Sequence, residues 1–142
     1  MLTSDYILGL VDGEGSFTVY VRNPKDSTPR KRRVKVEPRF YVKLIEKDKD
    51  ILYELKKFFG CGNVYFQGDK RKTHQNCYRY EVANREDLFH KIIPFFQKNK
   101  LQFVSKHRDF EIFCKIIECI RNKEHLTEKG WVKIYHLKTR MH

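Results

Sequence analysis

The chain has 142 residues, of which 40% are hydrophobic, so it is long enough for one domain with a substantial core but not for two. Lysine and arginine total 30 against 18 acidic residues, and the formal net charge of +12 favours a polyanionic partner, with nucleic acid ahead of an acidic membrane. No apolar run approaches the roughly 18 residues that a membrane span needs. We therefore expect a single globular domain over residues 1–142 that does not enter a membrane.

The four cysteines indicate a reducing compartment rather than a disulfide or metal framework. None of them forms a C-x-x-C pair, so the pattern does not favour a zinc site. We expect an intracellular protein, either in an organelle (chloroplast or mitochondrion) or in a prokaryotic cytoplasm. The cysteines are Cys61, Cys77, Cys114 and Cys119.

The first predicted elements are a helix and a strand. Thr3 or Ser4 can cap a helix that should end near Asp12 or Gly13. Strict alternation of apolar and polar residues then predicts a half-buried strand over 16–22. The remaining predicted elements are a loop over 23–29, a strand over 34–44, a helix over 49–59 capped by Asp48, strands over 63–67 and 77–83, a helix capped by Asn84 that Pro94 kinks or ends, a helix over 105–122 and a last helix from Thr127 through Leu137.

The strands arrive as two antiparallel pairs, and a helix follows each pair. The order is α-β-β-α-β-β-α-α-α, without an internal repeat or a low-complexity segment. This order predicts an α+β fold in which one four-stranded antiparallel sheet packs helices on its apolar face.

The alternation also predicts one polar face for the sheet. In the strand over 34–44, apolar side chains alternate with charged ones and a tyrosine, which is typical of a sheet that meets a polyanion. An ordinary solvated face is the alternative. Arginine, asparagine and glutamine on such a face are the side chains that pair with bases in the major groove. The outward residues are Thr18, Tyr20 and Arg22; Lys35, Glu37, Arg39, Tyr41 and Lys43; Asn63, Tyr65 and Gln67; and Cys77 and Arg79.

Two clusters of basic residues lie in turn-like stretches between the predicted strands. Cations in such loops contact phosphates more readily than bases, which gives affinity with a strong salt dependence. The first cluster is Arg30, Lys31, Arg32, Arg33 and Lys35, and the second is Lys70, Arg71 and Lys72.

The stretch ILGLVDGEG, residues 7–15, combines a helix with an acidic end. Gly9 and Gly13 are four residues apart and share one helical face, so another backbone can come close. Asp12 and Glu14 arrive where the helix ends and the strand begins. A carboxylate at the foot of a closely packed helix pair is a good place to hold a divalent metal. For the two glycines, close packing inside one monomer is the alternative.

This stretch resembles the LAGLIDADG signature of homing endonucleases, and the predicted element order is similar to the core repeat of that family from about Tyr6 to Ile117. The resemblance implies an αββαββα core with a saddle-like sheet. It also implies an intron- or intein-borne, site-specific endonuclease that acts on double-stranded DNA and has no small-molecule substrate. A catalytically silent nucleic-acid-binding protein on the same fold, such as an intron maturase or a regulator, is one alternative. A basic structural protein of a ribonucleoprotein is another.

The resemblance assigns three residues to the reaction. Glu14, the last acid of the motif, would coordinate the catalytic metal, and Mg²⁺ is the expected ion. Glu46 stands where the family often has a glutamine that helps to order active-site water. Lys106 matches a lysine at the start of the long helix. For Asp12, a hydrogen bond to the backbone is favoured over metal ligation.

One copy of the motif supplies one metal carboxylate, whereas cutting both DNA strands needs two. The resemblance to single-motif members therefore implies a homodimer on a long pseudo-palindromic site. The helix of the motif would pack against its symmetry mate. The residues expected in that interface are Tyr6, Gly9, Leu10 and Gly13.

Overall fold

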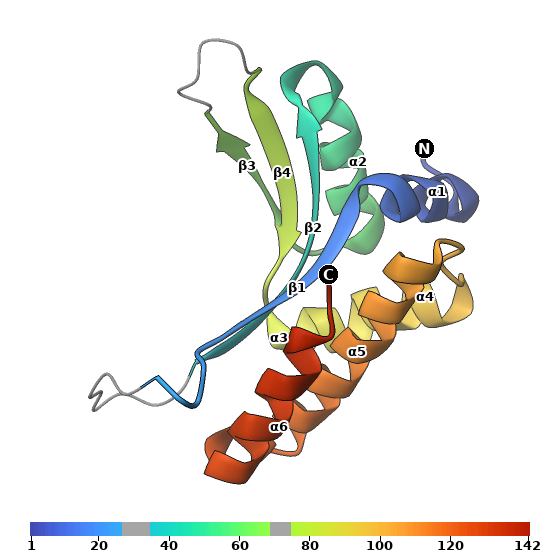
Figure 1. Ribbon diagram of the computed structural model, residues 1–142. Coiled ribbons are helices and arrows are strands. Elements are labelled where there is room, and N and C mark those ends of the chain that lie inside the picture. The colour runs from blue at the N-terminus through green and yellow to red at the C-terminus, as the bar shows by residue number, and fades with distance from the viewer. Residues whose placement is uncertain (27–34, 69–74) are drawn as a thin grey trace.

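In the computed structural model, which describes residues 1–26, 35–68 and 75–142, one bent sheet carries the helices on one of its faces (Figure 1). The opposite face has no helix on it within these ranges. This is the α+β architecture that the element order predicts. The elements are α1 (Ser4–Glu14), β1 (Gly15–Val21), β2 (Val36–Ile45), the 3₁₀ turn η1 (Glu46–Asp48), α2 (Lys49–Phe59), β3 (Asn63–Gln67), β4 (Cys77–Val82), α3 (Arg85–Asp87), the π turn η2 (Leu88–Ile92), α4 (Ile93–Lys98), α5 (Val104–Arg121), the 3₁₀ turn η3 (Glu124–Leu126) and α6 (Glu128–Thr139).

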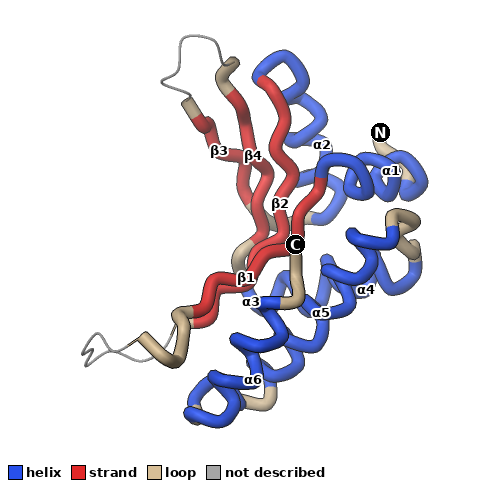
Figure 2. Tube along the Cα trace, viewed as in Figure 1, coloured by secondary structure: helices blue, strands red, loops and turns tan. Residues whose placement is uncertain are grey.

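The sheet has the strand order β1-β2-β4-β3, and all three pairings are antiparallel (Figure 2). Ser16 pairs with Tyr41, Tyr41 with Glu81, and Glu81 with Asn63. These four residues form one row across the sheet, and directly paired residues point to the same face. The predicted four-stranded antiparallel sheet is therefore confirmed.

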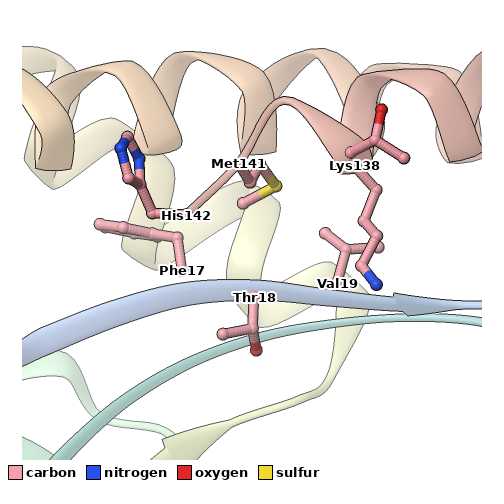
Figure 3. A pocket seen from close by; sticks show the side chains of 7 residues that line it. Phe17, Thr18, Val19, Lys138, Met141 and His142 are labelled. Carbon is pink, nitrogen blue, oxygen red and sulfur yellow. The ribbon is translucent and has the colours of Figure 1, made fainter.

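Side chains of β1 alternate between the two faces as expected. Phe17 and Val19 are buried, and Figure 3, which looks into the cleft between β1 and the end of α6, shows both on the side of α6. Thr18 points away from them, through the opposite face of the strand (Figure 3). Because the side-chain period of a strand is two, this direction holds for every second residue of β1.

An aromatic cluster joins the sheet to the helices. Phe17 lies at its centre, and burying one such ring contributes about 1.5–3 kcal/mol. The rings contact one another edge to face or tilted, which is the arrangement that aromatic quadrupoles prefer. The centroid of the Phe17 ring lies 5.1 Å from that of Phe40, 5.5 Å from Phe96, 5.2 Å from Phe110 and 5.3 Å from Phe113.

Helix α1 begins as predicted but ends later. The Thr3 hydroxyl accepts a hydrogen bond from the Tyr6 N–H at 3.2 Å, so Thr3 is the N-cap. The helix continues through Glu14, past the expected end at Asp12 or Gly13. The N–H of Gly15 still bonds to the Val11 carbonyl, which keeps the last turn closed. Glu14 is therefore the final helical residue, directly before β1.

The predicted cap at Asn84 is confirmed, because its side chain accepts from the Asp87 N–H at 3.0 Å. Thr127, the predicted start of the last helix, is also a cap, and its hydroxyl accepts from the Gly130 N–H at 3.0 Å. Asp48 occupies the N-cap position of α2 as predicted, but its side chain makes no capping hydrogen bond.

Pro94 does not end its helix. The chain turns continuously from Arg85 to Lys98, and the π turn η2 lies just before the proline. A wider turn changes the backbone hydrogen-bond pattern where proline lacks an N–H. Among the described helices, none is both long and apolar enough to cross a bilayer.

Candidate active site and nucleic-acid interface

The end of α1 presents one acid to solvent and keeps the other inside. Glu14 is exposed, whereas Asp12 is only 5% exposed. Both carboxylate oxygens of Asp12 accept from the Gln102 N–H, at 3.1 and 3.0 Å, and one also accepts from the Phe103 N–H at 3.2 Å. These two N–H groups directly precede α5, so Asp12 ties the end of α1 to the start of α5. This contact agrees with the backbone role favoured for Asp12.

Lys106 lies beside the junction of α1 and β1. It sits in the first turn of α5, is half-buried, and its ammonium donates to the carbonyl oxygen of Gly15. A cation in this position opposes the helix dipole, so the carbonyl acceptor offsets a local cost. The structure therefore brings Lys106 next to the residue that follows Glu14. An ammonium there can polarise a water molecule or contact a phosphate.

Glu46 lies at the same end of the sheet but farther along it. Gly15 pairs with Val42, and Glu46 is four positions farther along the chain, which corresponds to about 13 Å for an extended backbone. The Glu46 side chain is exposed, and its N–H donates to the Asn76 carbonyl at 3.0 Å. Within the described ranges, no recorded contact joins it to Glu14 or Lys106. Its catalytic role stays a prediction.

The exposed Glu14 is the side chain at this end of the molecule that could bind a divalent cation. No three His, Cys, Asp or Glu side chains gather at one point in the described part of the chain. Mg²⁺ is usually bound through one or two carboxylates, water and substrate phosphates, and a single exposed Glu14 matches that pattern.

Burial raises the pKa of the Cys114 thiol to about 12, so this thiol stays protonated at neutral pH.

The outer face of the sheet carries a network of charges around Glu81. The Glu81 carboxylate lies 2.9 Å from the Arg79 guanidinium and 3.8 Å from that of Arg39, which also lies 3.5 Å from Glu37. The Arg79 guanidinium also covers the Tyr41 ring, 3.5 Å from its centroid. Glu81 lies two residues after Arg79 on β4 and therefore shares its face, but it is not among the residues predicted to contact DNA. The Arg79-x-Glu81 spacing on one strand face is the signal that could have found the pair.

The other outward residues differ in exposure. Tyr20, Lys35, Lys43, Asn63 and Tyr65 are exposed. Thr18, Gln67 and Cys77 are half-buried on the same sheet. Six of the basic residues predicted to contact DNA lie outside the described residues, and they are Arg30, Arg32, Arg33, Lys70, Arg71 and Lys72.

Arg22 does not continue the alternation of β1. The strand ends at Val21, and the Arg22 guanidinium lies 5.2 Å from the centre of the Trp131 ring on α6. The Trp131 Nε1–H also donates to the Arg22 carbonyl at 2.8 Å. The prediction of a side chain beside Thr18 and Tyr20 is therefore corrected: packing against Trp131 directs Arg22 toward the helices.

The glycine face of α1 is open. A Cβ atom added at Gly9 or at Gly13 would meet no atom of the described residues within 4 Å. The alternative of close packing inside one monomer therefore has no support in this part of the chain. Tyr6 beside them is 52% exposed, and Phe103 and Val104 at the start of α5 are 54% and 85% exposed.

The exposed acid at the end of a glycine-faced helix, the αββαββα order and the charged outer sheet face agree with the resemblance drawn from the sequence. The chain belongs to the LAGLIDADG endonuclease family, whose model matches residues 7–117.

Relatives and solved structures agree with this membership. The chain is 33% identical over 134 residues to the probable intron-encoded endonuclease 2 of Neurospora crassa, covering 94% of this chain but 26% of that protein. It is 29% identical over 116 residues to homing endonuclease I-ApeII of Aeropyrum pernix, covering 82% and 63%. The homing endonuclease I-TnaI has 37% identity and a TM-score of 0.80, over 99% of this chain and 88% of that one. Meganuclease I-SmaMI bound to uncleavable DNA has 30% identity and a TM-score of 0.84, over 100% and 46%.

Proposed function

We propose that the chain is a site-specific double-strand DNA endonuclease that hydrolyses phosphodiester bonds with Mg²⁺ as a homodimer on a long pseudo-palindromic site. The observation that carries the proposal is the junction of α1 and β1, where exposed Glu14 lies next to the carbonyl group that binds Lys106. Structures of the relative I-SmaMI, one with uncleaved DNA and calcium ions and one with cleaved DNA, support the choice of substrate.

Each residue at the junction has a separate task in this proposal. Glu14 would hold the metal through its carboxylate, since it is exposed and directly precedes Gly15, whose carbonyl accepts from the Lys106 ammonium. The bound ion would supply an activated water and stabilise the leaving oxygen. Lys106 would hold a water or a non-bridging phosphate oxygen. Glu46 would orient water from the neighbouring strand, and Asp12 would fix α5 against α1.

The outer sheet face would lie in the major groove. Arginine reads guanine, and asparagine or glutamine reads adenine, through paired hydrogen bonds. Arg39, Arg79 and Asn63 are candidates for such contacts on the described strands. The exposed Lys35 and Lys43 would contact phosphates, and affinity should therefore fall steeply with salt.

The homodimer follows from the count of acids and from the open glycines. One chain offers one exposed Glu14, whereas a double-strand cut needs two such groups. Gly9 and Gly13 leave space on α1 that a second copy of the helix would occupy. Phe103 and Val104 would extend that interface with apolar surface.

A cleavage assay tests the proposal. Duplexes selected from a random library by binding in Ca²⁺ would be cloned into a plasmid and incubated with Mg²⁺. The wild type should linearise the plasmid, and Glu14→Gln should bind equally well but cut at least about 10³-fold more slowly, since it loses the metal carboxylate. Asp5→Asn, which removes an exposed acid from the other end of α1, is the matched control and should cut normally. Cutting by Glu14→Gln would remove Glu14 from the reaction.

One observation favours a second function. Glu46 adds a negative charge where the family often has a glutamine, and a carboxylate near phosphate disfavours binding of the scissile group. A nucleic-acid-binding protein without cleavage, such as an intron maturase or a regulator, would tolerate this change. Binding of the selected duplex in both Ca²⁺ and Mg²⁺, with cutting in neither, would support that function over the nuclease.

A further inference from the structure

The cations on the outer sheet face are of two kinds. Arg39 and Arg79 are held in ion pairs with Glu81. Lys43 on β2, and Lys35 directly before this strand, are exposed, and the structure records no ion pair for either of them within the described residues. The difference between the two paired arginines and these two lysines, which have no recorded partner in the described ranges, suggests that they have different roles in binding.

Glu81 is unusual for an acid on such a surface. Its side chain is 14% exposed, although it faces the side of the sheet that has no helix. It lies in the centre of the face, because β4 is flanked by β2 and β3. The acid is therefore covered by its two arginines and by its neighbours in the row, Tyr41 and Asn63. A carboxylate in the middle of a face that binds a polyanion repels phosphate, so we expect Glu81 to have a role that offsets this repulsion.

The contacts of Arg79 indicate what that role is. Its guanidinium is held from the side by Glu81 at 2.9 Å and from below by the Tyr41 ring at 3.5 Å. The Arg79 Nε is buried without a hydrogen-bond partner of its own. These contacts restrain the plane of the Arg79 guanidinium in the absence of a ligand. A guanidinium that is already oriented loses less entropy when it forms two parallel hydrogen bonds.

We propose that Glu81 is a positioning residue for base recognition. It aims Arg79, and with it Arg39, at fixed base pairs, while Lys35 and Lys43 supply contacts that do not depend on sequence. The inference rests on the proposed function, because it assumes that this face lies in the major groove of DNA.

The sheet register places this network close to the cut. Glu81 shares a row with Ser16, two strands away, and Ser16 is two residues after Glu14. Two strand spacings amount to about 10 Å. The two residues from Ser16 back to Glu14 add about 7 Å along the chain, roughly at right angles, so the separation from Glu14 is about 12 Å. At about 3.4 Å per base pair, this corresponds to about three to four base pairs from a phosphate at Glu14. The base pairs that depend on Glu81 are therefore the inner ones of each half-site.

Selection from a random duplex library in Ca²⁺, followed by sequencing, tests the proposal. The variants are Glu81→Gln and, as a matched control, Glu118→Gln, which makes the same charge change at an exposed site on α5, one of the helices on the opposite side of the sheet. Glu118→Gln should select the wild-type site. Glu81→Gln should bind random duplex at least as well, yet lose about tenfold of its preference at one or two inner base pairs of each half-site.

Arg79→Lys provides a second measurement that does not depend on Glu81. It keeps the charge and removes the planar fork, so it should lose preference at the same inner base pairs. A Glu81→Gln profile equal to the wild type, or one weakened equally at every position, overturns the role of Glu81. Absence of any preference in the wild type overturns the proposed function itself, so the two failures are distinguishable.

Discussion

The face of α1 that meets the sheet is filled with side chains, whereas its outward face carries two glycines. Ile7 and Val11 are fully buried on the inner face. On the outer face, Gly9 and Gly13 have open space around them. Glycine in a helix costs roughly 0.5–1 kcal/mol relative to alanine. The inner face therefore stabilises the fold of the subunit. The glycines of the outer face lower helix stability, which is consistent with a role in contacting another molecule.

The largest effect should follow a change to the inner face. Ile7→Ala should lower the free energy of unfolding by about 2–5 kcal/mol, because it opens a cavity against the sheet. Urea denaturation monitored by circular dichroism measures this change. Tyr6→Ala, on the outer face and 52% exposed, is the control and should change the value by about 0.5 kcal/mol or less at low protein concentration. Equal decreases in the free energy of unfolding for the two variants would show that the two faces of α1 contribute equally to stability.

A smaller effect is expected at the polar end of the inner face. Asp12→Asn should cost about 1.5–3 kcal/mol, because the charged acceptor of the Gln102 and Phe103 N–H groups is lost. The same urea titration applies. Asp5→Asn in the exposed first turn should cost less, about 0.3–1 kcal/mol, through the helix dipole alone. A neutral result at Asp12 would mean that water replaces its contacts.

The smallest effect on folding, with the opposite sign, belongs to the outer face. Gly9→Ala should raise the free energy of unfolding of the monomer by about 0.5–1 kcal/mol, because alanine is the better helix former and its Cβ meets open space. If the wild type is the proposed dimer, the same variant should sediment as a monomer at micromolar concentration.

A control for the glycine experiment lies in the same segment. At Gly15 an added Cβ would come within 2.6 Å of Val11 Cγ1, so Gly15→Ala should destabilise the subunit instead. A Gly9→Ala protein that unfolds more easily, or that keeps the wild-type oligomeric state, would show that the outward face is not an interface.

Local patterns account for what could be predicted from the sequence. Alternation along β1 separates Phe17 from Thr18 correctly, since the period of a strand depends on its own backbone. The caps at Thr3 and Asn84 are likewise contacts over three residues. The position of Lys106 beside Gly15 follows from the family resemblance rather than from any periodicity.

Contacts between distant segments could not be predicted in the same way. The bonds from Asp12 to Gln102 cross 90 residues, and a hydrophobic pattern contains no information about such a pair. The ion pair of Glu81 with Arg39 needs the register of β2 against β4. The Arg22 side chain packs against Trp131 and does not continue the alternation of β1, because Arg22 lies just beyond the end of that strand.

The tie between α1 and α5 has a consequence for how such genes can evolve. The bonds of Asp12 to the start of α5 and of Lys106 to Gly15 lie within one chain, so folding of the subunit alone sets the place of Glu14 relative to Lys106. In the proposed dimer, association would add a second centre without reshaping the first. Gene duplication followed by fusion would preserve both centres at once, and each half could afterwards diverge toward its own half-site.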